Sequence, residues 1–307
     1  MESFNNSEYA ILMGNLLNDT QYVKISNMGK MAGLRKQAEV IVRKILNIGS
    51  DTKLMLGQVQ KKSNNQAVNI GINNLGDELG NKLIDIVMKI NLLGSAGTHT
   101  QHIEEFSDEE VASVEDAILD LYALMFIKYF LDIKVSIYST PQVLRLVSLL
   151  PPVIRYKTWN YLFEKDKNNI LVVDKLCLSI IKLFNKDEAF KWLKDNEELI
   201  KSIPFPTEME KYKYYRINTV ELSPGKYQTL VSLNFEQYTN MYDLLYDKIR
   251  SPQTSINESG KMYKSFEESM EHYIKNKCFL NNNSEEMTTL LSLMDFVYLG
   301  RKPKSKM

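Results

Sequence analysis

The chain has 307 residues, and its 38 Lys and Arg residues balance its 38 Asp and Glu residues, so the formal net charge is zero. This balance excludes a protein that is drawn to nucleic acid or to an anionic membrane by its overall field, and any such binding has to be local. The two cysteines, Cys177 and Cys278, lie far apart and fit neither metal-ligand spacing nor a disulfide framework, which favours a reducing, cytoplasmic location.

The length predicts two domains with a substantial core. Residues 1–19 lack the basic-then-apolar order of a secretory signal, and no apolar run reaches bilayer-spanning length, so we expect no membrane association. We place a helical bundle at 1–138 and a second, mostly helical domain at 139–300, with the boundary just before Thr140-Pro141. The basic tail, 301–307, is expected to be disordered.

Helical periodicity predicts the main elements of the first domain. From Lys30 to Ile48, apolar residues recur at helical spacing while basic residues occupy the remaining arc. The segment 57–75 is rich in Asn, Gln and Gly, which predicts a connection with one short helical turn. A second helix is predicted over 77–93, and Gly94 is expected to end it because glycine accepts the left-handed cap conformation.

The sequence marks the start of a third helix. Ser107 and Glu110 form a capping-box pattern, and an apolar stripe then runs to Leu131, which predicts the central packing helix of the first domain. Residues 101–120 contain eight carboxylates and no Lys or Arg, whereas residues 30–62 contain eight basic residues and two acidic ones. We therefore expect a basic helix to face an acidic one, within a chain or across a homodimer.

The second domain is predicted to be a compact array of short helices with one small β-hairpin, so the fold class is mainly α. The hairpin is predicted from the alternating segments 214–222 and 227–233 around Ser223-Pro224-Gly225, near residues 212–233. The helical patterns of this half lie at 144–150, 153–163, 170–184, 189–200, 235–249, 263–274 and 287–299.

Three consecutive features of the first domain resemble the bacterial HEPN superfamily, in particular its domains from restriction and abortive-infection proteins. They are the helix that carries Leu34-Arg35-Lys36-Gln37-Ala38-Glu39, the helix that runs through Ile90-Asn91-Leu92-Leu93-Gly94-Ser95-Ala96-Gly97-Thr98-His99, and the capped third helix. The resemblance covers about residues 31–133. It implies a helical bundle that often dimerises, and in active members a metal-independent ribonuclease with an arginine and a histidine across the dimer cleft.

Carried onto this chain, the resemblance puts His99 at the histidine position and Asn91 where the arginine is expected. A neutral imidazole can take the proton of a ribose 2′-hydroxyl, and an imidazolium can protonate the leaving oxygen. The phosphate also needs a cationic or amide clamp, and Asn91 supplies neither charge nor a bidentate fork. Substitute cations are Lys89, half a turn earlier, and Arg35 or Arg43 from the neighbouring helix.

A structural interpretation of the same histidines stays open. His99 and His102 can donate to the free carbonyls at the end of the 77–93 helix and interact with its negative end. Two histidines three residues apart in a loop are a weak metal signal, so no metal and no cofactor is predicted.

Two sets of residues are candidates for contacts with nucleic acid. The first lies on the basic helix of the first domain, and the second lies beside the predicted hairpin, where tyrosines stack on bases and basic residues contact phosphates. Composition alone can also produce the second set, because the chain has 17 tyrosines. The candidates are Arg35, Lys36 and Arg43 in the first set and Lys213, Tyr214 and Arg216 in the second.

Two functions remain, and whether the chain is an enzyme stays open. The first is a non-catalytic or degenerate HEPN-like binding and regulatory protein, linked to phage defence or a toxin system, with RNA or a partner protein as its target. The second is a metal-independent endoribonuclease that cleaves RNA at a dimer cleft with His99. The missing arginine favours the first.

Overall fold

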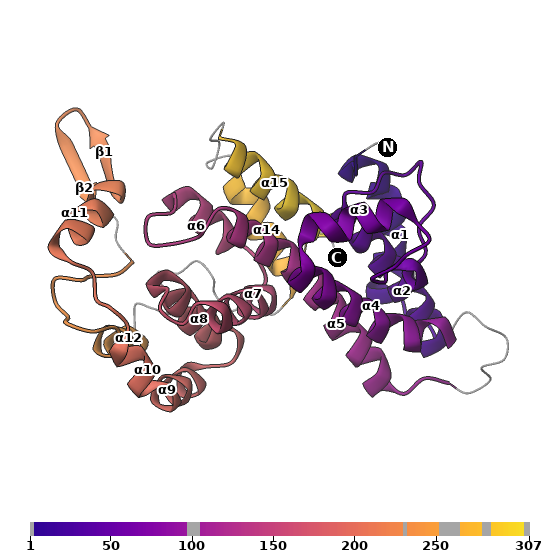
Figure 1. Ribbon diagram of the computed structural model, residues 1–307, viewed down its shortest axis with the longest axis horizontal. Helices are drawn as coiled ribbons and strands as arrows, with labels where there is room; N and C mark the ends of the chain where they lie inside the picture. Colours follow the sequence, from indigo (N-terminus) through magenta and orange to yellow (C-terminus); the bar gives the residue numbers. More distant parts are fainter. Residues whose placement is uncertain (1–2, 97–104, 230–231, 252–264, 278–283, 304–307) are drawn as a thin grey trace. The chain divides into compact units, whose positions relative to one another are not determined.

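The computed structural model describes residues 3–96, 105–229, 232–251, 265–277 and 284–303 (Figure 1). Within these ranges the fold is mainly α-helical, as predicted, and its one sheet is a two-stranded hairpin. No helix in the described part combines the length and the apolar character that crossing a bilayer requires. The chain forms two compact units, Met1–Tyr129 with Leu291–Met307, and Phe130–Leu290.

The boundaries of these two units differ from the domain boundary that the sequence predicts. The first break lies at 129/130 instead of 138/139, inside a helix, and residues 291–307 group with the N-terminal unit. Lys44 shows why the C-terminal helix belongs there. Its Nζ donates to Asn6 Oδ1 and to Ser292 Oγ, each at 3.0 Å, and lies over the rings of Phe4 and Phe296. Both ends of the chain are thereby fixed on one helix.

The first unit is a bundle of helices joined by short connections, drawn in indigo to purple in Figure 1. The helix α2 packs against both α3 and α4. Large side chains fill the core of the first unit, among them Leu34, Ile41, Tyr122 and Phe126. Its elements are η1 (Asn6–Tyr9), α1 (Ala10–Leu17), η2 (Asn18–Tyr22), α2 (Asn27–Leu46), η3 (Leu56–Gln58), α3 (Gln66–Leu75), α4 (Asp77–Ala96), most of α5 (Asp108–Asp132) and the end of α15 (Glu285–Val297).

Two predictions about this unit were wrong. The segment 57–75 is not a connection with a single turn, because it contains the ten-residue helix α3. The Asn65 side chain caps α3 by accepting from the backbone N–H of Ala67, and Gly71 is buried against Leu46. Gly94 does not end α4, which continues to Ala96. A glycine costs helix stability but does not terminate a helix by itself.

The predicted start of α5 is confirmed. Glu110 donates its backbone N–H to Ser107 Oγ at 3.2 Å, and Ser107 donates its own N–H to Glu110 Oε2 at 2.9 Å. The predicted facing of basic and acidic segments is also found, within the chain, because Lys30 Nζ lies 2.8 Å from Glu115 Oε1. Asn27 adds a side-chain donor to Asp108 Oδ1 at 3.0 Å. These contacts join the start of α2 to α5.

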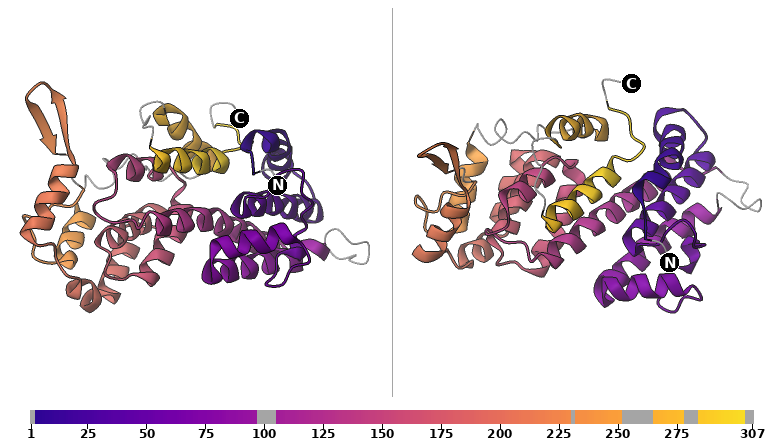
Figure 2. Two further views of the ribbon diagram at one scale, coloured as in Figure 1. Left: turned by 45° about the horizontal axis from the view of Figure 1, so that its top comes forward. Right: turned by 90° about the horizontal axis from the view of Figure 1, so that it is seen from above.

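The second unit is an array of short helices from which the hairpin extends at the end of α11 (Figure 2). The fully buried Trp159 of α7 packs on Phe130, and Asp174 of α8 lies 2.5 Å from Lys248 Nζ of α12. The elements are α6 (Pro141–Val147), α7 (Pro152–Lys165), α8 (Ile170–Leu183), α9 (Lys186–Asp195), α10 (Glu197–Ser202), α11 (Glu208–Ile217), β1 (Thr219–Ser223), β2 (Lys226–Thr229), α12 (Met241–Arg250) and α14 (Phe266–Lys277).

The hairpin is shorter than predicted. Its strands are antiparallel, with Thr219 opposite Thr229, and Gly225 takes a positive φ of 75° in the turn. Residues 214–217, expected at the start of the first strand, belong to α11 instead. The physical reason is a capping box, because the Thr207 hydroxyl accepts from the backbone N–H of Glu210 and starts a helix there.

The predicted disordered tail is described only in part. Arg301 donates its backbone N–H to Tyr298 O at 3.1 Å, and Lys302 Nζ lies 3.3 Å from Asn18 Oδ1. Residues 304–307 lie outside the described ranges.

Candidate functional site

The turn on which the sequence argument centred lies outside the described residues. This applies to both His99 and His102, so the catalytic and the capping interpretations of His99 both stay predictions. The helix that leads into this turn, α4, is described. It carries Asn91 four turns from its start, on the side that faces α2.

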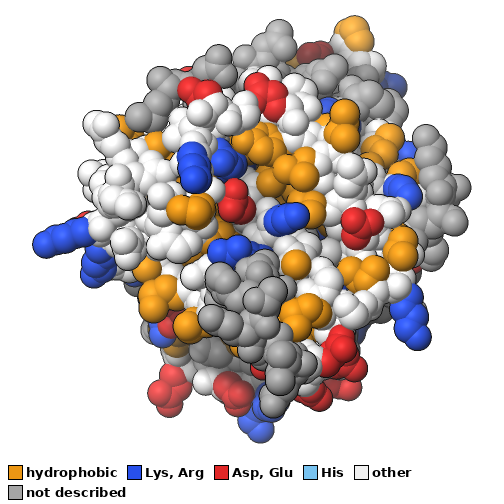
Figure 3. Space-filling model, turned by 90° about the vertical axis from the view of Figure 1, so that its right-hand side faces the viewer, with side chains coloured by type: hydrophobic (Ala, Val, Ile, Leu, Met, Phe, Trp, Pro, Cys, Tyr) orange, Lys and Arg blue, Asp and Glu red, His pale blue; other side chains and the backbone are white. Residues whose placement is uncertain are grey.

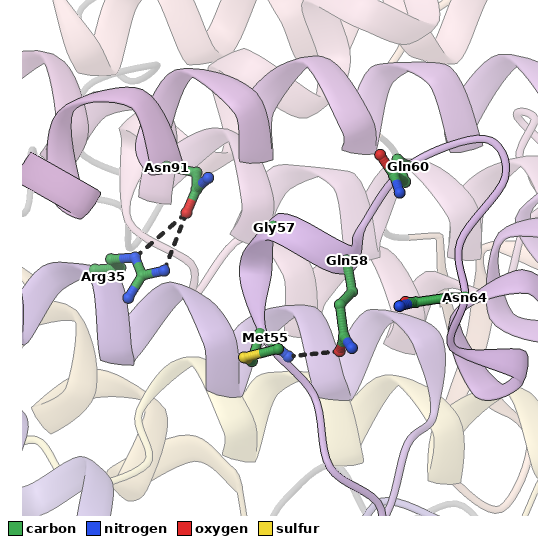
Figure 4. Close-up of a pocket in the computed structure, with 7 residues that line it drawn as sticks. All are labelled: Arg35, Met55, Gly57, Gln58, Gln60, Asn64 and Asn91. Atoms are coloured by element: carbon green, nitrogen blue, oxygen red, sulfur yellow. Dashed lines mark hydrogen bonds between the residues drawn. The ribbon is translucent and has the colours of Figure 1, made fainter.

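The structure brings together two of the predicted site residues, Arg35 and Asn91. Asn91 Oδ1 accepts from Arg35 Nη2 at 3.1 Å and from Arg35 Nε at 3.4 Å (Figure 4). Both side chains are half-buried, and the pair joins the middle of α2 to the last part of α4. A guanidinium therefore stands directly beside the position where the resemblance implied an arginine.

Arg35 and Asn91 form one wall of a pocket of about 380 Å³. The opposite wall comes from η3 and the chain that follows it, as Figure 4 shows. The residues that line the pocket are Arg35, Met55, Gly57, Gln58, Gln60, Asn64 and Asn91. Sequence reasoning missed the five that lie between 55 and 64. The signal that could have found them is the run of amide side chains that follows Gly57 in a segment poor in apolar periodicity.

Hydrogen bonds fix which way two of the pocket amides point. Asn91 Oδ1 is taken by Arg35, and Gln58 Oε1 accepts from the backbone N–H of Met55 at 3.1 Å and from Asn65 Nδ2 at 3.3 Å. Because these oxygens are occupied by internal donors, the Nδ2 of Asn91 and the Nε2 of Gln58 remain as donors. No Asp or Glu is among the residues that line the pocket.

The surroundings of the pocket are locally basic although the chain as a whole is neutral. Residues 52–76 contain three lysines and no carboxylate. All three, Lys53, Lys61 and Lys62, are exposed. The face shown in Figure 3 has Lys and Arg side chains interspersed with hydrophobic and acidic ones. A local positive field of this kind attracts an anion without any net charge on the protein.

One carboxylate interacts with Arg35 from its own helix. Burial raises the pKa of Glu39, and the positive charges of Arg43 and Arg35 partly offset that rise. The Arg43 guanidinium lies 3.9 Å from Glu39 Oε1. Glu39 is not a lining residue of the pocket, so it affects Arg35 through charge alone.

The structure gives the other predicted cations of the first unit different environments. Arg43 is only 9% exposed, and its Nη1 donates to the carbonyl oxygens of Gly49 at 2.9 Å and Thr52 at 2.8 Å. Arg43 therefore closes the turn after α2 and is not open to nucleic acid, which corrects the sequence prediction. Lys36 and Lys89 are exposed, and neither lines the pocket.

The predicted aromatic and basic cluster of the second unit lies on α11, where Tyr214 is buried while Lys213 and Arg216 are exposed. Tyr214 is 3% exposed, packs on Phe235 and accepts from the backbone N–H of Leu233 at 3.1 Å. Burial raises the pKa of Tyr214. The Tyr214 ring is part of the core, so it is not exposed for stacking on a base as the sequence predicted, and its role is structural. Lys213 and Arg216 are exposed, and Lys213 Nζ lies 4.3 Å from the centre of the Tyr138 ring.

In the part of the chain that the structure describes, no group of three or more His, Cys, Asp or Glu side chains is placed to hold a metal ion. The site is therefore characterised by one guanidinium and several amides in a pocket. No protein-family model, no curated protein and no solved structure matches the chain.

Proposed function

We propose that the N-terminal unit is a HEPN-like, non-catalytic binding and regulatory module that holds RNA by a phosphate at the Arg35 pocket. The proposal places it in the cytoplasm, as part of a phage-defence or toxin system. The observation that carries it is the Arg35 guanidinium, held by Asn91 Oδ1 at 3.1 Å on the wall of a pocket with no lining carboxylate. A charge-assisted hydrogen bond from a guanidinium is among the strongest that a protein offers a phosphate.

The basic segment beside the pocket supports the same function. Phosphate contacts supply most of the affinity of proteins for RNA and DNA, and they need lysines or arginines along the path of the backbone. Lys53, Lys61 and Lys62 offer such contacts beside the Arg35 pocket. A further exposed cation, Lys89, stands on the helix that carries Asn91.

An exposed apolar strip on α4 supports association with a second protein molecule. Met88 is 55% exposed and Leu92 is 72% exposed, and residues four apart lie on the same face of a helix. A homodimer or a partner protein of the same defence system would cover this strip. Light scattering on the samples described below gives the mass of the RNA-binding species.

The alternative is a metal-independent endoribonuclease. It is favoured by the presence of a cation at the position of the missing arginine, since Arg35 reaches Asn91 from the neighbouring helix. In that mechanism Arg35 would stabilise the charge of the phosphate, and His99 would transfer the proton of the 2′-hydroxyl.

The test measures binding and cleavage of a fluorescent single-stranded RNA at constant low salt. We expect Arg35→Leu to weaken binding by about 10-fold or more, which corresponds to the loss of one charge-assisted contact. Lys36→Leu is the matched control because it removes the same charge from the next residue of the helix, outside the pocket. Equal losses in both variants would leave only a diffuse electrostatic contribution and contradict the proposal.

Cleavage is measured in the same samples. Intact RNA that is bound with dependence on Arg35 supports the binding module. Cleavage that disappears in His99→Ala supports the alternative. RNA that is neither bound nor cleaved overturns both.

A further inference from the structure

The geometry points to a terminal phosphate, a phosphomonoester at an RNA end, as the group that the Arg35 pocket takes. This inference rests on the proposed function and narrows it. An internal phosphodiester would bind along the surface lysines, whereas the pocket would select the end of the chain. The steps below concern the donors, the shape and the neighbouring apolar contact of the pocket.

The first step is the set of donors on Arg35. A guanidinium has five N–H groups in a fixed plane. Asn91 Oδ1 occupies the side edge, formed by Nε and one N–H of Nη2. Among the described residues, Asn91 is the one hydrogen-bond partner of Arg35, so the end edge remains, with parallel N–H groups from Nη1 and Nη2. Two parallel donors match two oxygens of a phosphate.

The second step is the set of amide donors. Internal bonds hold the side-chain oxygens of Asn91 and Gln58, which leaves Asn91 Nδ2 and Gln58 Nε2 as donors. Together with Arg35 they give the pocket a positive, donor-dominated lining. A phosphomonoester has three terminal oxygens and a charge of about −1.5 to −2 at pH 7. A phosphodiester has two non-bridging oxygens and a single charge, so it uses fewer of these donors.

The third step is the shape of the pocket. At about 380 Å³ it is in the range of cavities that enclose a small ligand. A pocket of this volume can hold a phosphate group together with part of the nucleotide that carries it. Met55, which is 46% exposed, lines the same pocket and offers an apolar surface to the sugar or base next to the phosphate.

Gly57 provides a way to fill the pocket without replacing any of the residues that supply its donors. A Cβ at this position would lie 3.8 Å from Asn91 Nδ2, at ordinary contact distance, and Gly57 does not have a positive φ. Gly57→Ala should therefore be accommodated, and Gly57→Leu should place its side chain in the volume that the ligand needs. Far-UV circular dichroism checks that both variants keep the helical fold.

The experiment compares three RNAs of one sequence that carry a 5′-phosphate, a 3′-phosphate or only hydroxyl ends. We expect one phosphorylated RNA to bind the full chain at least about 10-fold more tightly than the hydroxyl RNA. Gly57→Leu and Arg35→Leu should abolish that preference, and Lys36→Leu should retain it. Inorganic phosphate at millimolar concentration should compete with the phosphorylated end.

The outcomes separate this inference from the proposed function. RNA that binds with dependence on Arg35 but with equal affinity for all three ends overturns the inference and leaves the proposed function in place. A preference that persists in Gly57→Leu also overturns the inference. If inorganic phosphate and a phosphorylated mononucleotide bind while RNA does not, the pocket is a phosphomonoester site for a free small molecule and the proposed function fails. No binding of any probe overturns both.

Discussion

The close contact between α2 and α3 gives a sharp test of how the first unit is packed. A Cβ on Gly71 would lie 2.7 Å from Leu46 Cβ, 2.9 Å from Leu46 Cδ2 and 3.0 Å from the Leu46 carbonyl oxygen. Non-bonded carbon atoms prefer separations of about 3.5–4.0 Å, so α3 would have to move away from α2 by about 1 Å. Overpacking of this kind costs about 1–3 kcal/mol, and the better helix propensity of alanine returns up to about 1 kcal/mol. We expect Gly71→Ala to lower the free energy of unfolding by about 1–2 kcal/mol.

Gly29→Ala is the matched control. Its Cβ would meet Ile25 Cδ1 and Ser26 Oγ at 3.5 Å, which is ordinary contact, and Gly29 also lies in a helix. This variant should be neutral or more stable by up to about 1 kcal/mol. The assay is urea unfolding followed by far-UV circular dichroism, with the midpoints compared at an unchanged slope. Equal shifts for the two variants would refute the packing of α3 on Leu46.

Two further predictions concern buried charge. In the second unit, Lys248→Met removes one of the two lysines that pair with the fully buried Asp174 carboxylate, and Lys175 Nζ stays at 3.2 Å. The loss of one hydrogen-bond partner of a buried group should lower the free energy of unfolding by about 1–3 kcal/mol. The fluorescence of Trp159 and Trp192, both in that unit, reports the urea transition, and an unchanged midpoint would contradict the buried ion pair. In the first unit, burial raises the pKa of Glu39, so the native state binds more protons than the unfolded state between the unfolded and the folded pKa. The free energy of unfolding should therefore fall as pH rises through that window. Glu39→Gln should gain stability relative to the wild type between pH 4 and pH 7. A stability difference between the two proteins that stays constant over this range would show that the pKa of Glu39 is not raised.

The sequence predicted the elements whose local signals agree with one another. The α5 helix has a capping box at Ser107 and an apolar stripe after it, and both hold in the structure. The α3 helix was missed because its stability comes from tertiary contact. Val68 and Gly71 are buried against the rest of the unit, whereas the Asn and Gly content of the segment is typical of a loop. The last residues of α11, 214–217, were assigned to a strand because they begin the alternating apolar and polar pattern of 214–222.

The candidate site was predicted in part. Arg35 and Asn91 were both named, but their hydrogen bond depends on how α2 packs on α4 across 56 residues of sequence. Arg43 shows the limit of helical periodicity. It lies eight residues after Arg35, which turns it by about 80° around the helix axis, and near the helix end it finds the carbonyl oxygens of Gly49 and Thr52. The pocket lining from 55 to 64 follows a path without regular periodicity, so helix and strand patterns did not indicate it.

Asn91, which stands where the resemblance implies an arginine, affects how Arg35 is held in the pocket. Two guanidinium groups about 4 Å apart repel by about 4 kcal/mol at an effective dielectric constant of 20, so an arginine at position 91 would drive Arg35 away until an anion arrived. Asn91 is neutral and offers an acceptor oxygen, so its Oδ1 holds Arg35 Nη2 at 3.1 Å. A donor that is already in place loses less side-chain entropy when it binds. Asn91 therefore orders Arg35 on the wall of the pocket, which is the arrangement that the proposed phosphate-binding function requires.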